Sequence, residues 1–149
     1  MRRLPIPFVF KFLNQFKNKT DRNTALCVEV IAKDHIANLL SLAYEKLRTD
    51  LLPLLKEELE NSAFQSKTEQ AFKIGLLSDH EMKCYQLIWL ICEAHARNQQ
   101  IPFSFQTEPV LGLCLQLHSN PSYKEWHNTD GRSMFLLGTM KLLYSTSPD

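Results

Sequence analysis

Four side chains that could do chemistry lie close together in the second half of the sequence: Glu93, His95, Arg97 and Asn98. A histidine can act as a general base near neutral pH, because its unperturbed pKa is about 6.5. An arginine supplies a permanent positive charge in a planar geometry that suits phosphate. Cleavage of RNA needs such a base for the 2′-hydroxyl and such a cation for the developing phosphate charge. On one helix, however, positions 95 and 97 point about 200° apart, so the pair converges only if the helix ends between them.

This cluster lies within the stretch 78–105, around which the rest of the chain is organised. Ser78 and Glu81 have the spacing of a capping box, in which each side chain bonds one unpaired amide of a helix start. Apolar residues then recur every three or four positions: Met82, Tyr85, Trp89 and Cys92, with Leu87, Ile88, Leu90 and Ile91 widening the stripe. A helix that is apolar over so much of its circumference has neighbours on several sides. The sequence therefore predicts a central helix that carries the cluster at its C-terminal end.

The whole chain predicts a single all-α domain. Its 149 residues, 44% of them hydrophobic, can bury one core, and only four glycines argue against a turn-rich β architecture. Helices are expected at 21–48, 51–59, 63–77, 107–117 and 132–144, with a long loop at 119–131 and a frayed tail at 146–149. Residues 1–19 predict a basic amphipathic helix that docks on the body through Phe8, Val9, Phe12, Leu13 and Phe16. The expected architecture is a bundle of six or seven helices.

The long helix at 21–48 is expected to bury one stripe of residues. The stripe alternates steps of four and three: Leu26, Val30, Lys33, Ala37, Leu40, Tyr44 and Leu47. Its polar member, Lys33, is followed by Asp34 and His35. These groups could meet Glu93 or Arg97 across the core. A buried ion pair that fixes helix register is the preferred interpretation, because a buried charge needs a partner whatever its function, and a binding site is the alternative.

Charge and cysteine content limit the classes of function. The net charge is +1, so there is no overall electrostatic footprint for nucleic acid. Residues 1–22 hold six of the 17 basic residues against one acid, Asp21. This arm could touch a membrane surface, but an exposed helix with solvated lysines is preferred. The four cysteines show no CxxC pairing, which favours reduced thiols in a cytoplasmic protein, and no apolar run approaches the roughly 18 residues of a transmembrane segment.

Several segments, taken in order, are similar to one known family. The segment TDRNTALCVEVIAKDHIANLL opens with Asp21 and Arg22 and carries Asp34 twelve positions later. It is followed by the helix end AFKIGLLS, the central helix, a Phe103-Ser104-Phe105 lid, and a late Arg132 and Phe135. Residues 12–145 thereby resemble the mannitol-operon-repressor-like (MltR) family. The resemblance implies a HEPN-like helical domain at 20–145 in a bacterial regulator of transcription. We expect this regulator to work as a dimer.

HEPN domains carry an Arg, usually followed by Asn, and a His about five residues later at the end of the central helix. The corresponding residues here run from Ile91 to Arg97 and read ICEAHAR. Cys92 stands at the Arg position, Glu93 at the Asn position and Arg97 at the His position. No Arg in the chain is followed by His four to six residues later. The motif is therefore degenerate, and the RNA-cleaving activity that it implies is not carried over to this chain.

Other patterns give weaker signals. His80 and Cys84 are one helical turn apart, but no second pair accompanies them, so no metal site is predicted. Apolar neighbours should raise the pKa of Cys92 and make its thiol inert. No glycine-rich phosphate loop is present, and no cofactor is expected. No helix-turn-helix with a basic recognition helix stands out, so direct sequence-specific DNA binding is not expected.

The sequence thus favours a non-catalytic regulatory protein that acts through protein–protein contacts, with another protein or a second copy as partner. The expected contact patch consists of Glu93, His95, Arg97, Asn98, Asp21 and Arg22. The alternative is a HEPN-type ribonuclease or toxin–antitoxin component that binds RNA and uses His95 and Arg97 in a displaced site.

Overall fold

The structure, a computed structural model, describes residues 6–47, 63–97, 103–118 and 131–147. Within these ranges it contains six α-helices and no strand. The helices are α1 (Ile6–Asn14), α2 (Asp21–Leu47), α4 (Phe64–Lys73), α5 (Asp79–Arg97), α6 (Val110–His118) and α7 (Gly131–Thr146). The predicted all-α bundle is therefore confirmed. The helix expected at 51–59 and nearly all of the loop expected at 119–131 lie outside the described residues.

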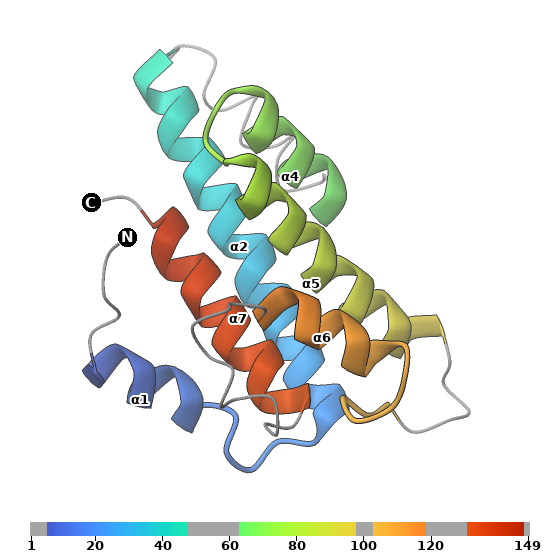
Figure 1. The fold of residues 1–149 in the computed structure, drawn as a ribbon. Coiled ribbons are helices and arrows are strands. Elements are labelled where there is room, and N and C mark those ends of the chain that lie inside the picture. Colours follow the sequence, from blue (N-terminus) through green and yellow to red (C-terminus); the bar gives the residue numbers. More distant parts are fainter. Residues whose placement is uncertain (1–5, 48–62, 98–102, 119–130, 148–149) are drawn as a thin grey trace.

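The central helix of the bundle is α5, which packs against α2, α4, α6 and α7, while α2 is the longest helix (Figure 1). Both α4 and α5 pack against α2 and against each other, and α5 also packs on α6 and α7. Helices α2 and α5 run in opposite directions, while α1 lies across one end of the bundle against α7 (Figure 1). The start of α2 and the end of α5 therefore belong to the same end of the molecule.

The capping box predicted at the start of α5 is confirmed. The backbone N–H of Glu81 donates to Ser78 Oγ at 3.1 Å, and the N–H of Ser78 donates to Glu81 Oε1 at 2.9 Å. Each side chain thus satisfies one amide that has no partner within the helix. This reciprocal pair fixes the first residue of the helix that carries the predicted patch.

The helix before it, α4, ends earlier than the predicted 63–77. Gly75 has a φ of +87°, a left-handed conformation that residues with a Cβ rarely adopt. This turn lets the Leu76 N–H donate to the Ala71 carbonyl at 2.9 Å, which closes the helix at Lys73. The glycine therefore terminates the helix rather than loosening its last turn.

The buried face of α2 differs from the predicted stripe. Leu26 and Val30, two members of that stripe, are 41% and 58% exposed. Apart from Leu40, the buried face consists of residues outside the stripe, several of them small: Thr24, Ala25, Val28, Ala32, Ile36 and Leu39. Alanines at a helix interface let two helices pack closely, yet periodicity gives them less weight than Leu or Val. The prediction is wrong for the first half of the stripe, whereas Leu40 is buried as expected.

Phenylalanines close the end of the bundle where α2 and α7 begin. Phe105 is fully buried and stacks on Phe135 of α7 with ring centroids 4.9 Å apart, while Phe103 meets Phe105 edge-on at 5.0 Å. Gly131 permits this packing, because a Cβ at that position would collide with the Phe105 carbonyl oxygen. The segment that carries Phe103 and Phe105 is thereby held against the start of α7.

The N-terminal helix α1 packs through its phenylalanines. Phe12 is buried, and the ring of Phe8 lies 5.5 Å from that of Tyr144 in α7. Phe16, just after the helix, is also buried, while Lys11 on the opposite face is exposed. The apolar face therefore contacts α7 and leaves the basic face in solvent.

Candidate functional site

The end of α5 and the start of α2, which carry the two halves of the predicted patch, lie at one end of the bundle. The Cys92 thiol of α5 donates to the Ala25 carbonyl of α2 at 3.6 Å. The two helices run in opposite directions, so the turn of α5 that follows Cys92 lies level with the turn of α2 that precedes Ala25. The last turn of α5, which ends at Arg97, is thus level with the first turn of α2, which contains Asp21 and Arg22.

Two residues of the predicted patch, Glu93 and Arg22, have described side chains that are partly accessible to solvent. Glu93 is half-buried, as is Arg22. The side chains of His95 and Arg97 and the whole of Asn98 lie outside the described residues. The alignment of the helix ends therefore rests on the backbone of α2 and α5.

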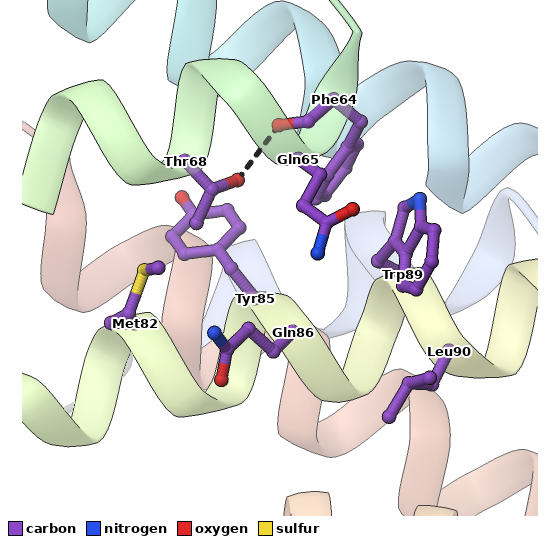
Figure 2. Close-up of a pocket in the computed structure, with 8 residues that line it drawn as sticks. All are labelled: Phe64, Gln65, Thr68, Met82, Tyr85, Gln86, Trp89 and Leu90. Carbon is purple, nitrogen blue, oxygen red and sulfur yellow. Dashed lines mark hydrogen bonds between the residues drawn. The ribbon is translucent and has the colours of Figure 1, made fainter.

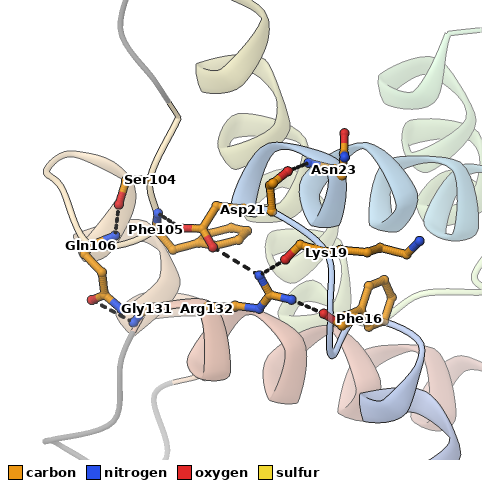
Figure 3. A network of polar contacts seen from close by, with 10 residues as sticks. Phe16, Lys19, Asp21, Asn23, Ser104, Phe105, Gln106, Gly131 and Arg132 are labelled. Atoms are coloured by element: carbon orange, nitrogen blue, oxygen red, sulfur yellow. Dashed lines mark hydrogen bonds and ion pairs between the residues drawn. The ribbon is translucent and has the colours of Figure 1, made fainter.

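Asp21 is occupied by a structural network (Figure 3). Its Oδ2 accepts a hydrogen bond from the Phe105 N–H at 3.1 Å, and its Oδ1 lies 3.3 Å from Arg132 NH1. The helix cap is supplied by the preceding residue, since Thr20 Oγ1 accepts from the Asn23 N–H at 3.1 Å. The carboxylate of Asp21 is thus engaged within the protein, and sequence reasoning did not foresee this role.

Arg132 is the centre of the same network. Its guanidinium donates to the carbonyl oxygens of Phe16 and Lys19 as well as to Asp21 (Figure 3). A planar guanidinium has five donors in a fixed fork, so one side chain can bind several acceptors at once. Arg132 therefore ties the linker between α1 and α2 to the start of α7. The resemblance singled out Arg132, but the bonds that it makes could not be read from the sequence.

His35 contacts Thr146 of α7 and not Glu93, so the expected contact between His35 and Glu93 is wrong, while the side chain of Arg97 lies outside the described residues. Its Nε2 lies 2.9 Å from Thr146 Oγ1 of α7, and the hydroxyl of Tyr85 lies 3.1 Å from the same atom. Thr146 Oγ1 in turn donates to the Leu142 carbonyl at 2.8 Å. The hydroxyl of Thr146 can accept from both His35 and Tyr85 while it donates to the backbone. Its neighbour in sequence, Asp34, is exposed.

This cluster joins α2, α5 and α7 in the interior. Burial lowers the pKa of His35 and raises the pKa of Tyr85, because each would lose hydration in its charged form. Both groups are therefore neutral near pH 7, as a structural cluster requires. Sequence analysis missed Thr146 because the last helix was expected to end at about residue 144, whereas α7 continues to Thr146.

The position at which the resemblance expects an arginine is apolar and closed. Cys92 is 3% exposed, and burial raises the pKa of its thiol. A thiol in this state is protonated near neutral pH and is neither a nucleophile nor a cation. The expected inertness of Cys92 follows from this environment, and the inner face of α5 offers no charge at this position.

A shallow pocket of about 160 Å³ lies between α4 and α5, as Figure 2 shows. It is lined mainly by apolar side chains and by two glutamines: Phe64, Gln65, Thr68, Met82, Tyr85, Gln86, Trp89 and Leu90. The Thr68 hydroxyl already donates to the Phe64 carbonyl, and Tyr85 is bound to Thr146. Small-molecule sites usually measure about 300–1,000 Å³, so this pocket suits a single side chain better than a metabolite.

The pair His80 and Cys84 does not extend into a metal site. Sγ of Cys84 and Nε2 of His80 lie 3.7 Å apart, a hydrogen-bonded pair. In the described ranges, no group of three or more His, Cys, Asp or Glu side chains is arranged to hold a metal ion. None of the helices in these ranges has the length and apolar character needed to cross a bilayer.

Comparison with known proteins gives one informative match. No family model matches the sequence, and no curated protein sequence matches it. A chain of the X-ray structure of the MtlR-HPr complex from Escherichia coli superimposes with a TM-score of 0.67 at 16% identity. The match covers 95% of this chain and 99% of that chain. At this identity the likeness establishes an MtlR-like helical fold.

Proposed function

We propose that this protein is a regulatory module that acts by binding another protein and catalyses no reaction itself. The observation that carries the proposal is the match over nearly the full length of both chains with a structure of a protein–protein complex. The fold, rather than one motif, is what the two chains share. By that likeness the first partner to test is HPr, and the regulated process would be transcription in the cytoplasm, as the sequence resemblance implies.

The chemistry of α5 supports a non-catalytic role. The position that would hold a catalytic arginine holds Cys92, which is buried, protonated and bonded to the α2 backbone. A phosphate-cleaving site needs a cation that reaches the developing charge, and a neutral thiol cannot supply one. The groups that could contact a partner are those of the helix ends: Glu93, His95, Arg97 and Asn98 from α5 and Arg22 from α2.

Within this patch Asp21 has an indirect role. Its two carboxylate oxygens hold the Phe105 amide and Arg132, so it fixes the start of α2, the helix that carries Arg22. The proposed contact surface is therefore mixed in charge, with the carboxylate of Glu93 and the guanidinium groups of Arg22 and Arg97. Such surfaces give specificity and association rate more than affinity.

The proposal is tested by measuring partner binding and folding on the same variants. Purified protein is titrated against HPr by calorimetry, and immobilised protein is used to capture binding proteins from lysate of its native cell. Arg97→Ala should weaken binding while the melting temperature changes little. Lys73→Ala, an exposed change at the end of α4, is the matched control and should leave both unchanged. Unchanged capture together with a large fall in melting temperature would show that Arg97 has a structural role.

The alternative, an RNA-cleaving enzyme, is favoured by one observation. His95 and Arg97 lie in the last turn of the helix that carries the catalytic pair in HEPN domains. An RNA-cleavage assay with the wild type and the His95→Ala variant separates the two proposals. Reproducible cleavage that disappears in the variant would refute the non-catalytic proposal.

A further inference from the structure

One face of α2 carries an exposed row of four residues with apolar members in the middle and opposite charges at its ends. The row consists of Arg22, Leu26, Val30 and Asp34, each separated from the next by four positions. Val30 is 58% and Leu26 is 41% exposed, although both are branched aliphatic side chains. Asp34 is exposed and Arg22 is half-buried. Both apolar side chains therefore belong to the exposed surface of the described part of the chain.

Residues four apart form a ridge on a helix surface. When two helices pack with such ridges side by side, they cross at about −50°, the commonest arrangement in globular proteins. From Arg22 to Asp34 the ridge rises by twelve positions, which is about 18 Å of helix. A second helix with the same kind of ridge would therefore lie against all four side chains.

The order of these residues makes the ridge complementary to a reversed copy of itself. An antiparallel copy, related by a twofold axis between positions 26 and 30, places the partner subunit's Val30 opposite Leu26. The same operation places the partner subunit's Asp34 opposite Arg22, and both contacts occur twice. Neither Arg22 nor Asp34 forms an ion pair with another described residue of its own chain. A twofold interface requires this kind of self-complementary surface.

We propose that the protein forms a twofold-symmetric dimer through the Arg22–Leu26–Val30–Asp34 ridge of α2. The aliphatic pair forms the dry centre of the contact, and the two Arg–Asp pairs at its ends fix the antiparallel register. This inference rests on the proposed function in that it names a second copy as one protein partner. It is tested independently, because self-association is measured without any other protein.

The dimer is expected to be weak and dependent on concentration. A single ridge covers less surface than the roughly 1,200 Å² of a stable interface, so the dimer belongs to the weak, transient class. Exposed ion pairs add little affinity, but like charges placed opposite one another repel. Reversing one charge of the pair therefore opposes association at both ends of the contact.

Sedimentation equilibrium of the full chain up to about 1 mM tests the proposal. Wild type should show a monomer–dimer equilibrium, and Val30→Asp should be monomeric throughout this range. Arg22→Asp and Asp34→Arg should each weaken dimerisation at least about tenfold, since each creates two like-charge contacts. The double variant that carries both reversals should regain most of the wild-type affinity. Glu69→Arg, an exposed reversal on α4, is the control and should leave the equilibrium unchanged.

The double variant separates loss of this interface from loss of folding. Every substituted side chain is exposed or half-buried, and circular dichroism at each concentration checks that the helices persist. A monomeric wild type at the highest concentration, or a double variant no stronger than the single ones, would overturn the proposal. Loss of HPr capture with an intact dimer would count only against the proposed function.

Discussion

Asp21 and Arg132 are separated by 111 positions in the chain, yet Oδ1 of the one lies 3.3 Å from NH1 of the other. Their side chains are only about a quarter exposed. Through them the start of α2, the linker after α1, the Phe105 segment and the start of α7 are held together. The resemblance singled out both residues as positions that match the family, and the geometry shows that each holds several segments of the fold together.

Removing Arg132 should therefore destabilise the protein more than removing its acidic partner. Arg132→Ala loses the bonds to Phe16, Lys19 and Asp21, and should lower the free energy of unfolding by about 2–3 kcal/mol. Asp21→Ala loses the Phe105 amide and one ion pair, and should cost about 1–2 kcal/mol. Urea titrations measure both, with Glu69→Ala as an exposed control. An Arg132→Ala cost no larger than that of Asp21→Ala would mean that the two carbonyl contacts contribute nothing.

The second prediction concerns the polar cluster in the core. Thr146→Val keeps the shape of the side chain but removes the oxygen that Tyr85 and His35 bind. The buried Tyr85 hydroxyl and the half-buried His35 ring then each lose a partner, which should lower the free energy of unfolding by about 1–3 kcal/mol. Thr146→Ser keeps the oxygen and loses only a methyl group, so its cost should be smaller, about 1 kcal/mol. Equal costs for the two variants would show that packing, not hydrogen bonding, fixes this position.

The third prediction is a pH dependence of stability from His35. Burial lowers its folded-state pKa below the ordinary value of 6.5. Between the folded pKa and 6.5 the unfolded chain binds the proton and the folded protein does not, so the free energy of unfolding falls as pH falls through this window. Above this window the contribution is constant.

The variant His35→Gln tests this dependence, because glutamine retains a donor for Thr146 without titrating. Urea titrations between about pH 8 and pH 5 should give the variant a flatter profile than wild type. The other histidines serve as an internal reference, since they are present in both proteins. A variant profile parallel to that of wild type would show that His35 does not titrate differently in the two states.

The fourth prediction concerns the four free thiols. Cys27 is half-buried, while Cys84, Cys92 and Cys114 are buried, and burial raises the pKa of all three, that of Cys114 to about 12. Because only the thiolate reacts, a disulfide reagent near pH 8 should modify Cys27 first in the native protein. Peptide mass spectrometry after short labelling identifies the site, and labelling in denaturant provides the reference of four thiols. Early labelling of Cys92 would contradict the closed environment found at that position.

Some of the fold was readable because its cause is local. The start of α5 was predicted from Ser78 and Glu81, whose side chains bond amides three residues away. The all-α class followed from periodic apolar residues and few glycines. The end of α4 was placed too late, although Gly75 marked it, because a helix-ending glycine and a tolerated one look alike until the backbone angle is known.

The stripe on α2 could not be read in the same way. Periodicity weighs side chains by size, and so it favoured Leu26 and Val30 over Ala25 and Ala32. Which of two faces is buried depends on how closely the neighbouring helices approach, and small residues permit the closest approach. The exposed Leu26 and Val30 were thus assigned to the core, although they belong to the surface proposed here as a dimer contact.

The sequence by itself determined the helical class, the start of the central helix and the loss of the Arg–His pattern, since these depend on residue identity and short spacings. Only the tertiary structure decided that His35 bonds Thr146, that Asp21 holds Arg132 and Phe105, and that the end of α5 lies level with the start of α2. These contacts join residues far apart in the chain. Their geometry is set by helix packing, which no local spacing records.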